Sequence, residues 1–437
     1  MNIYYSILNR RNYNSFKFII IFLIAFILWT SALGELIHKT DDDSISTKFL
    51  IGFFIFFFVL IIFSLKWVKP ILNEGHVLNK YGFNIYKILV VFLVYQLLQA
   101  LLLLNVTALA TFPRYFFFFN LIIVGTIIAF RIPDKALMFM EKISIKWTYV
   151  FVILYTISFI KNPTIGLFRE IREHILFLNA IEDGGFFSVF FPFFLYSDLN
   201  RNIKYFFIFM FVLLLILING TQATILAVFI TFTIYLSYGF KKRKKSLQVL
   251  FVLAFLSISI VFFSDVLYDY DTGLSWSGVQ QTYQGMYAGS IGVRMGNIWV
   301  PMTLHVINKS PVIGFGNGSW RIQSEKHGFE SGNKRYFVFS RSPHNIFLVY
   351  FVDWGLIGLA IMVVLFYNAI KSNYKLLTNE RISVKIRRYA EGYLCGWISF
   401  LSWGFTGNAH NWLGWSVICF LLIGTITLKY YSEESFN

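Results

Sequence analysis

The side chains best suited to chemistry in this chain stand together in the stretch RSPHN, residues 341–345. Ser342 and Pro343 are typical of a helix start, because Ser caps unpaired backbone N–H groups and Pro lacks the N–H that would stay unpaired there. His344 and Asn345 are then predicted to lie in the first turn. The positive end of the helix dipole disfavours a charged imidazole, so His344 is expected to be neutral near pH 7, as a general base must be. The alternative is a histidine that only caps the helix or anchors it at a membrane surface.

The residues after this stretch predict a helix inside a membrane. The run 345–369 is almost wholly apolar and exceeds the ~20 residues that a bilayer crossing requires. Asp353 interrupts it about 13–14 Å beyond His344, at a rise of about 1.5 Å per residue, which is too far for contact with the imidazole. A buried acid in a membrane is costly, so Asp353 is predicted to have an internal partner, for example a polar group of a neighbouring helix. Gly355 and Gly358 are predicted to allow close helix contact.

The composition of the whole chain is that of a membrane protein. Of its 437 residues, 57% are hydrophobic and only 14% are charged, and the mean hydropathy is +0.64. Apolar runs near the bilayer length predict an all-α, polytopic integral membrane protein with about 12 transmembrane helices. Both cysteines, Cys395 and Cys419, lie inside such runs, which argues against a disulfide framework and a cysteine metal site. The runs lie near residues 18–34, 49–65, 86–106, 115–130, 147–160, 184–197, 205–220, 222–240, 247–264, 345–369, 390–406 and 412–428.

Basic residues predict the orientation in the membrane. The run KKRKK at 241–245 lies between two apolar runs and is expected on the cytoplasmic side. Alternation of the spans then places both termini and most of the 38 Lys and Arg in the cytoplasm. The net charge of +16 is therefore interpreted as an orientation signal and as contact with membrane lipid, not as a nucleic-acid site.

Three regions are predicted along the chain. An N-terminal membrane bundle of about nine spans covers 1–264, a large external loop covers 265–344, and about three closing spans cover 345–437. The loop, at about 80 residues, is far longer than ordinary connections, and its tryptophans favour an ordered, packed structure. Within it, NIWVPMTLHVINKSP (297–311) has apolar residues at helical spacing, which predicts a helix lying on the membrane.

Several motifs follow one another in a fixed order around the histidine. They are Arg294, Trp299, SPVIGFG (310–316), the pair His344–Asn345 and DWGLIG (353–358). This order resembles the C-terminal region of the O-antigen polymerase and O-antigen ligase superfamily, over residues 289–365. The resemblance implies a GT-C-like membrane glycosyltransferase of the bacterial inner membrane. Such an enzyme transfers a glycan carried on undecaprenyl diphosphate to an acceptor at the periplasmic face, so the external loop is expected to be periplasmic.

The resemblance also implies roles for individual residues. Arg294 matches the loop arginine of the family, and His344 matches its essential histidine. A further family arginine stands in a Thr-Arg-Ala sequence near the outer end of a membrane helix, where this chain reads NGTQATILAVF with Gln222 in its place. A glutamine can hydrogen-bond a phosphate but carries no charge. The missing charge is expected from another arginine, for which the candidates are Arg341, Arg321 and Arg172.

The chemistry of such a transfer suits these residue types. An acceptor hydroxyl attacks the anomeric carbon while His344 takes its proton, and Asn345 orients the ring or the sugar. The diphosphate is a good leaving group that needs its charge neutralised, and arginine does so with a bidentate, permanently protonated group. No metal and no cofactor is therefore expected, and direct displacement predicts inversion at the anomeric carbon.

Two other stretches compete as sites. Three aspartates, Asp41–Asp43, stand in the first external loop, where they could bind a cation or could simply form a solvated acidic loop. The sequence GNAHN at 407–411, which contains His410, could line the same site as His344 or could cap the last helix.

Three functions remain open. A polymerase would join lipid-linked repeat units to one another, with a polysaccharide chain-length regulator as a candidate partner, whereas a ligase would move the finished glycan to lipid A-core. The altered family arginine and a composition rich in Phe, Ile and Asn, typical of AT-rich polysaccharide gene clusters, favour the polymerase. A flippase for lipid-linked oligosaccharides also fits about twelve spans, but it would hold several charges inside its bundle for the diphosphate.

Overall fold

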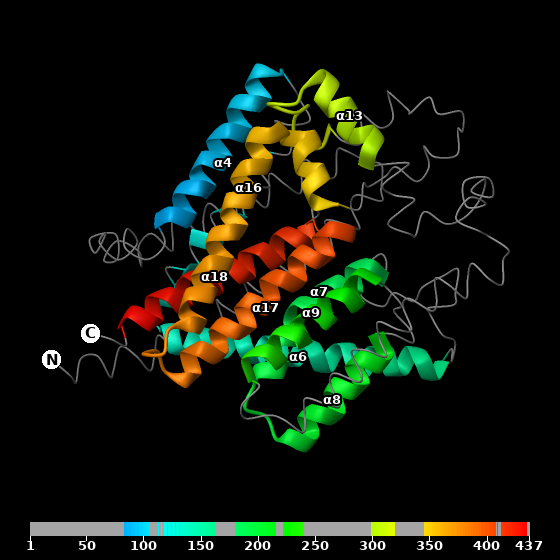
Figure 1. Ribbon diagram of the computed structural model, residues 1–437, viewed down its shortest axis with the longest axis vertical. Coiled ribbons are helices and arrows are strands. Elements are labelled where there is room, and N and C mark those ends of the chain that lie inside the picture. Colours follow the sequence, from blue (N-terminus) through cyan, green and yellow to red (C-terminus); the bar gives the residue numbers. More distant parts are fainter. Residues whose placement is uncertain are drawn as a thin grey trace, which may run out of the picture.

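A computed structural model gives the fold (Figure 1). It describes residues 83–104, scattered positions between 112 and 132, and then 133–161, 180–215, 222–239, 299–319, 345–407, 409 and 412–434. In these residues all regular secondary structure is helical, which confirms the all-α class. The predicted runs 18–34, 49–65 and 247–264 and the basic run 241–245 lie outside them.

Most of the helices follow the apolar runs, but α6 begins at Pro133, well before the predicted run 147–160. Four of them, α4, α6, α16 and α18, are long and apolar enough to cross a membrane by length and composition, which agrees with a multi-pass membrane protein. The figure of about twelve spans stays a prediction for the chain as a whole. The bounds are α4 Phe83–Leu102, α6 Pro133–Lys161, α7 Ala180–Tyr196, α8 Arg201–Leu214, α9 Gln222–Gly239, α13 Val300–Lys309, α16 Ile346–Thr378, α17 Val384–Thr406 and α18 Trp412–Glu434.

Helix α17 is the centre of the bundle, and it packs on α7, α16, α9 and α18. Small residues let its neighbours approach. A Cβ atom on Gly392 would lie 2.9 Å from the ring of Phe193, and Gly424 of α18 lies directly against the ring of Tyr393. Such close approach is how helices associate in a bilayer, where van der Waals packing replaces the hydrophobic drive.

Phenylalanine fills much of the space between the helices. Phe151, Phe191 and Phe211, from three different helices, are fully buried. The rings of Phe191 and Phe211 stack with centroids 4.2 Å apart, and those of Phe151 and Phe211 lie 4.4 Å apart. Part of the large phenylalanine content therefore forms an interlocked aromatic core.

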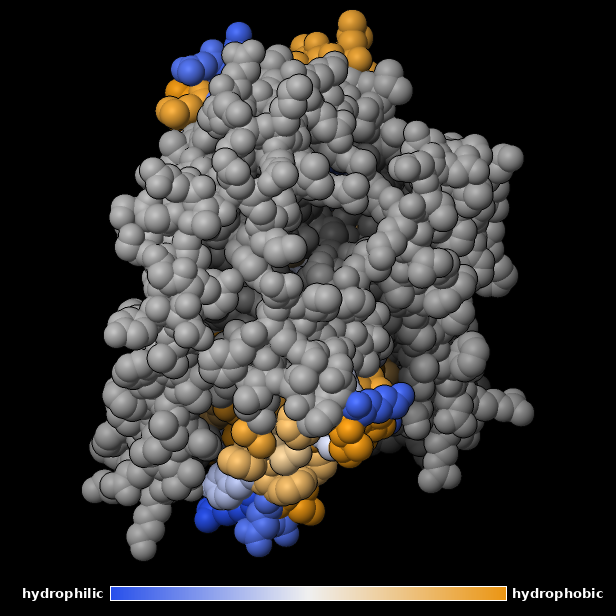
Figure 2. Space-filling view, turned by 90° about the vertical axis from the view of Figure 1, so that its right-hand side faces the viewer, coloured by the Kyte–Doolittle hydropathy of each residue, from blue (hydrophilic) through white to orange (hydrophobic). Residues whose placement is uncertain are grey.

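Helix α8 directs apolar side chains outward. Ile203, Phe206 and Phe209 stand on its exposed side, and Figure 2 shows apolar side chains gathered over the lower end of that face, with hydrophilic ones beside them. The helix begins at an Asn200 cap, whose side chain accepts from the backbone of Asn202. Its apolar outer side suits contact with lipid tails.

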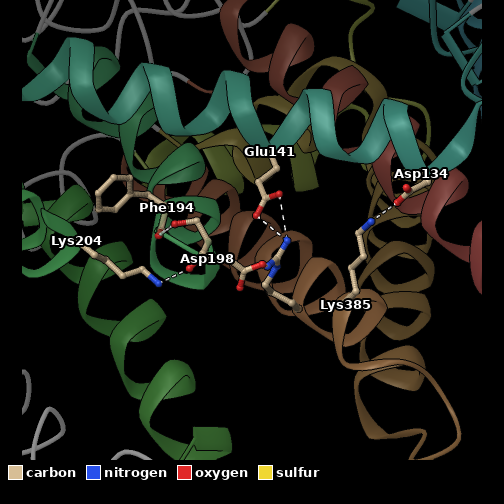
Figure 3. A network of polar contacts seen from close by, with 8 residues as sticks. Asp134, Glu141, Phe194, Asp198, Lys204 and Lys385 are labelled. Carbon is tan, nitrogen blue, oxygen red and sulfur yellow. Dashed lines mark hydrogen bonds and ion pairs between the residues drawn. The ribbon is translucent and has the colours of Figure 1, made fainter. Parts of the chain in front are cut away.

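Ion pairs connect the N-terminal half of α6 to the N-terminal end of α17 (Figure 3). Arg388 of α17 lies 3.2 Å from the carboxylate of Glu141 in α6 and also pairs with Asp198, in the segment between α7 and α8. Lys385 lies 2.6 Å from Asp134. All of these residues fall in regions that the sequence predicts to be cytoplasmic, so the network lies at the end of the bundle away from the candidate site.

Helix α16 is not the single continuous span that the run 345–369 predicts. Gly355 has φ 64° and ψ −165°, so helical geometry stops there and resumes one residue later. Figure 1 shows the two parts, 346–354 and 356–378, running in different directions from a sharp bend beside α13. The physical cause of the bend lies in the segment that follows α13.

Candidate functional site

The segment 310–319, here called the docked loop, packs directly against the bend in α16. It contains SPVIGFG, and the bend contains DWGLIG. Two motifs that are separate in the sequence are therefore parts of one structure. The break at Gly355 leaves helix carbonyls and N–H groups without their usual partners, which would cost several kcal/mol each in an apolar environment. Four backbone bonds replace them: Phe315 N to Val352 O at 2.9 Å, Gly316 N to Asp353 O at 2.9 Å, Leu356 N to Pro311 O at 2.9 Å and Ile357 N to Val312 O at 3.2 Å.

Two glycines make this docking possible. Gly314 and Gly355 both have positive φ, 70° and 64°. A Cβ atom on either would come within 3.0 Å of the backbone of the other. A side chain at these positions would therefore both strain the backbone and push the docked loop away from the helix.

Asp353 fastens the far end of the docked loop. Its side chain is buried, and its Oδ2 atom accepts a 2.9 Å hydrogen bond from the backbone N–H of Gly318. The sequence predicts an internal partner for this acid, and the Gly318 N–H is such a partner. It belongs to the docked loop, which the bend brings to this depth.

Helix α4 holds the docked loop from the other side. Gln99, which is buried, donates from Nε2 to the backbone oxygen of Asp353 at 2.7 Å and to that of Ile313. Tyr95 donates to Ile313 O at 3.1 Å and also to Trp354 O. Both side chains thus bridge the docked loop and the bend.

An aromatic cluster packs around Trp354, the residue just before the bend. Trp354 is fully buried, and its ring lies 4.7 Å from that of Phe92 and 5.6 Å from that of Tyr115, centroid to centroid. Tyr115 also donates from its hydroxyl to Asn317 Oδ1 at 3.0 Å. Tyr95, Gln99 and Tyr115 are not among the site residues predicted from the sequence. Gln99 carries a signal that could have identified it, since it is an uncharged polar residue inside an apolar run.

Helix α13 packs on the first part of α16 through an apolar contact. Met302 and Val306 of α13 cluster with Leu348 and Val352 of α16. Trp299, just before α13, belongs to the same cluster, and its ring lies 5.6 Å from that of Phe405 at the end of α17. The predicted helix within 297–311 is confirmed as α13.

The start of α16 differs from the prediction. The cap is Asn345, whose Oδ1 atom accepts from Phe347 N and Leu348 N at 3.0 Å each. Ser342 is therefore not the cap, and His344 precedes the cap instead of lying in the first turn. Asn caps a helix as well as Ser does, so both choices satisfy the local rules. Asn345 is buried, and its oxygen caps the helix. It therefore has a structural role in addition to the predicted role of orienting the histidine ring or the sugar.

Of the remaining candidate residues, Gln222 and His305 lie in described helices. Gln222 is the first residue of α9, which agrees with a place at a helix end. His305 lies on α13 with its ring stacked on Phe315, 5.3 Å between centroids. Outside the described residues lie Arg294, His344, Arg341, Arg321, Arg172, Asp41–Asp43, His327 and His410.

Metal ligands can be assessed only within the described part of the chain. There, no group of three or more His, Cys, Asp or Glu side chains is arranged to hold a metal ion. Cys395 and Cys419 are buried free cysteines. The site that the described residues build is thus a framework of backbone and amide hydrogen bonds around the start of α16.

Part of the chain matches a known protein family. Residues 206–363 match the family model described as O-Antigen ligase. This confirms the resemblance to the O-antigen polymerase and ligase superfamily. The matched region contains most of α8, all of α9, α13 and the docked loop, and α16 as far as residue 363, past its bend. No curated protein matches the chain.

Proposed function

We propose that this chain, whose residues 206–363 match the O-Antigen ligase family, is an O-antigen polymerase. It would transfer a glycan from undecaprenyl diphosphate to the acceptor sugar of another lipid-linked repeat unit. The family match is the observation that carries the proposal, because members of this family are membrane glycosyltransferase-like enzymes. The multi-pass helical fold is compatible with a bacterial inner-membrane enzyme with cytoplasmic termini and a periplasmic site.

The reaction would proceed by one displacement. The acceptor hydroxyl oxygen forms a bond to the anomeric carbon, the bond from that carbon to the diphosphate breaks, and the configuration inverts. His344 takes the hydroxyl proton as general base. Arg294 neutralises the departing diphosphate, with Arg341, Arg321, Arg172 and Gln222 as further candidate contacts. No metal and no cofactor enters this scheme.

The packing of α13 on α16 supports this pairing of base and arginine. Arg294 stands shortly before Trp299, and His344 directly precedes the Asn345 cap. Trp299 belongs to the cluster that joins α13 to the first part of α16. In the sequence, the proposed arginine therefore shortly precedes one side of this cluster and the proposed base shortly precedes the other.

The charges of the described bundle argue against a flippase. The buried charged side chains among the described residues are Glu141, Asp183 and Asp353, all acids. A path for a diphosphate would require buried bases instead. The ligase, which shares the family match, remains the nearer alternative.

A deletion strain separates the polymerase from the ligase. Loss of a polymerase should leave lipopolysaccharide with a single repeat unit on the core, seen as one rung on a gel. Loss of a ligase should instead leave bare core and accumulate lipid-linked polymer. An unchanged ladder would reject both functions.

A further inference from the structure

The docked loop is held by side chains as well as by backbone bonds. Four backbone bonds join it to groups that the bend exposes. Gln99 and the Asp353 carboxylate add further bonds, to Asp353 O, Ile313 O and Gly318 N. A buried carboxylate is costly in a membrane protein. The bond that the Asp353 carboxylate accepts goes to Gly318 of the docked loop, so its effect is to hold that loop.

These extra bonds set a register that apolar packing cannot set. Met302 and Val306 meet Leu348 and Val352 through side chains without polar atoms, and such contact is not directional, so helices held by it can slide. Hydrogen bonds fix both distance and angle. The bond from Gly318 to Asp353 therefore acts together with the four backbone bonds to fix how the docked loop sits on α16.

We infer that Asp353 and Gln99 are positioning residues, which hold α13, the docked loop and the first part of α16 in one register. They would thereby fix the points at which the chain enters α13, shortly after Arg294, and α16, shortly after His344. The inference rests on the proposed function. Neither side chain is assigned a contact with substrate. Because a misplacement of about 1 Å can reduce turnover by about 10²-fold, loss of the bonds should lower kcat much more than it changes KM for the lipid-linked donor.

The test compares Asp353→Ala, Asp353→Asn and Asp183→Asn in purified protein. Asparagine keeps an oxygen that can accept from Gly318 N, so Asp353→Asn should retain kcat within about 10-fold, whereas Asp353→Ala should lose about 10²-fold. Asp183 is the matched control: it is also a buried acid, and it accepts from the Tyr155 hydroxyl at 3.0 Å, away from the docked loop. Its variant should keep kcat close to wild type. Equal kcat in Asp353→Ala and wild type, or equal losses in Asp353→Ala and Asp183→Asn, would overturn the inference.

A cross-link reports the docking independently of activity. Val312 and Ile357 are joined through their backbones, and both side chains are exposed. A Val312→Cys, Ile357→Cys pair should form a disulfide in the otherwise wild-type chain, with a lower yield when Asp353→Ala is added. An unchanged yield would overturn the inference even if no glycan transfer were detected, and absence of transfer by the wild-type protein would count against the proposed function alone.

Gln99→Leu serves where Asp353→Ala does not fold. Leucine makes α4 more apolar, so membrane insertion is not impeded, and it removes both bonds from Nε2. It should lower kcat and cross-link yield in the same direction as Asp353→Ala. Wild-type values of both would overturn the inference.

Discussion

Gly314 and Gly355 lie so close together that a Cβ atom on either would meet the backbone of the other within 3.0 Å. They are far apart in sequence, and each belongs to a different motif. Their contact makes the docked loop and the bent helix one unit. Changes at this contact should therefore act on the folded state before they act on chemistry.

Replacing Gly355 with alanine should destabilise the protein clearly. The left-handed backbone costs an L-residue about 1–2 kcal/mol, and the clash with Val312 and Gly314 adds to it. Gly396→Ala is the control, because its Cβ would meet a movable Leu421 methyl at 3.0 Å. Thermal unfolding in detergent measures both. Equal midpoints for the two variants would contradict the close contact.

His344→Ala should abolish glycan transfer, with a loss of about 10²–10⁴-fold in turnover. His344→Gln keeps a hydrogen bond but cannot take a proton, so it should be nearly as inactive. The rate of the wild-type enzyme should fall as the pH drops below about 6.5, since a protonated imidazole cannot act as a base. His305→Gln is the control, since the observed contact of that ring is a stack on Phe315. Near wild-type turnover in His344→Gln would move the base to His305, His327 or His410.

Arg294→Ala should lose activity in a protein that still inserts and folds. Arg294→Lys should recover activity poorly, because a single ammonium group cannot reproduce a bidentate contact with a diphosphate. Initial rates with a lipid-linked donor measure both. Gln222→Arg should be tolerated if position 222 faces the diphosphate; failure of that variant to insert would show that the family position was wrongly transferred.

Glycan transfer should persist when metals are removed. Arginine is expected to neutralise the leaving group, so the purified enzyme should keep its rate in EDTA. Activity that is lost in EDTA and restored by Mg²⁺ or Mn²⁺ would move the candidate site to Asp41–Asp43.

Arg388→Ala should destabilise the bundle by up to about 3 kcal/mol, because it leaves the largely buried Glu141 without its counter-charge. Lys385→Ala is the control. Its pair with Asp134 is nearly half exposed, so the loss should stay below about 1 kcal/mol. Denaturant or thermal unfolding in detergent measures the difference. Equal losses would mean that Arg388 acts through its surface contact with Asp198 and not through Glu141.

The sequence by itself determined the class of the protein and the places of its helices. Long apolar runs are a local property, since about 20 consecutive residues decide whether a segment suits a bilayer. The runs 86–106, 184–197, 222–240, 390–406 and 412–428 accordingly coincide with α4, α7, α9, α17 and α18 within a few residues. The order of the motifs around His344 was also sufficient to indicate the family that residues 206–363 match.

Local rules placed the start of α16 only approximately. Ser342 and Asn345 are both good caps, and the chain uses Asn345. The choice depends on how residues 346–354 pack against α13 and α17, which spacing along the chain does not reveal.

Only the tertiary structure decided the bend and the partner of Asp353. A glycine inside an apolar run permits a straight helix as readily as a break, because the cost of a break depends on whether other residues take up the freed backbone groups. Here those residues are the docked loop, Tyr95, which bonds Trp354 O, and Gln99, which bonds Asp353 O. They lie far from Gly355 in the sequence, so the bend becomes visible only when the folded chain brings them to it.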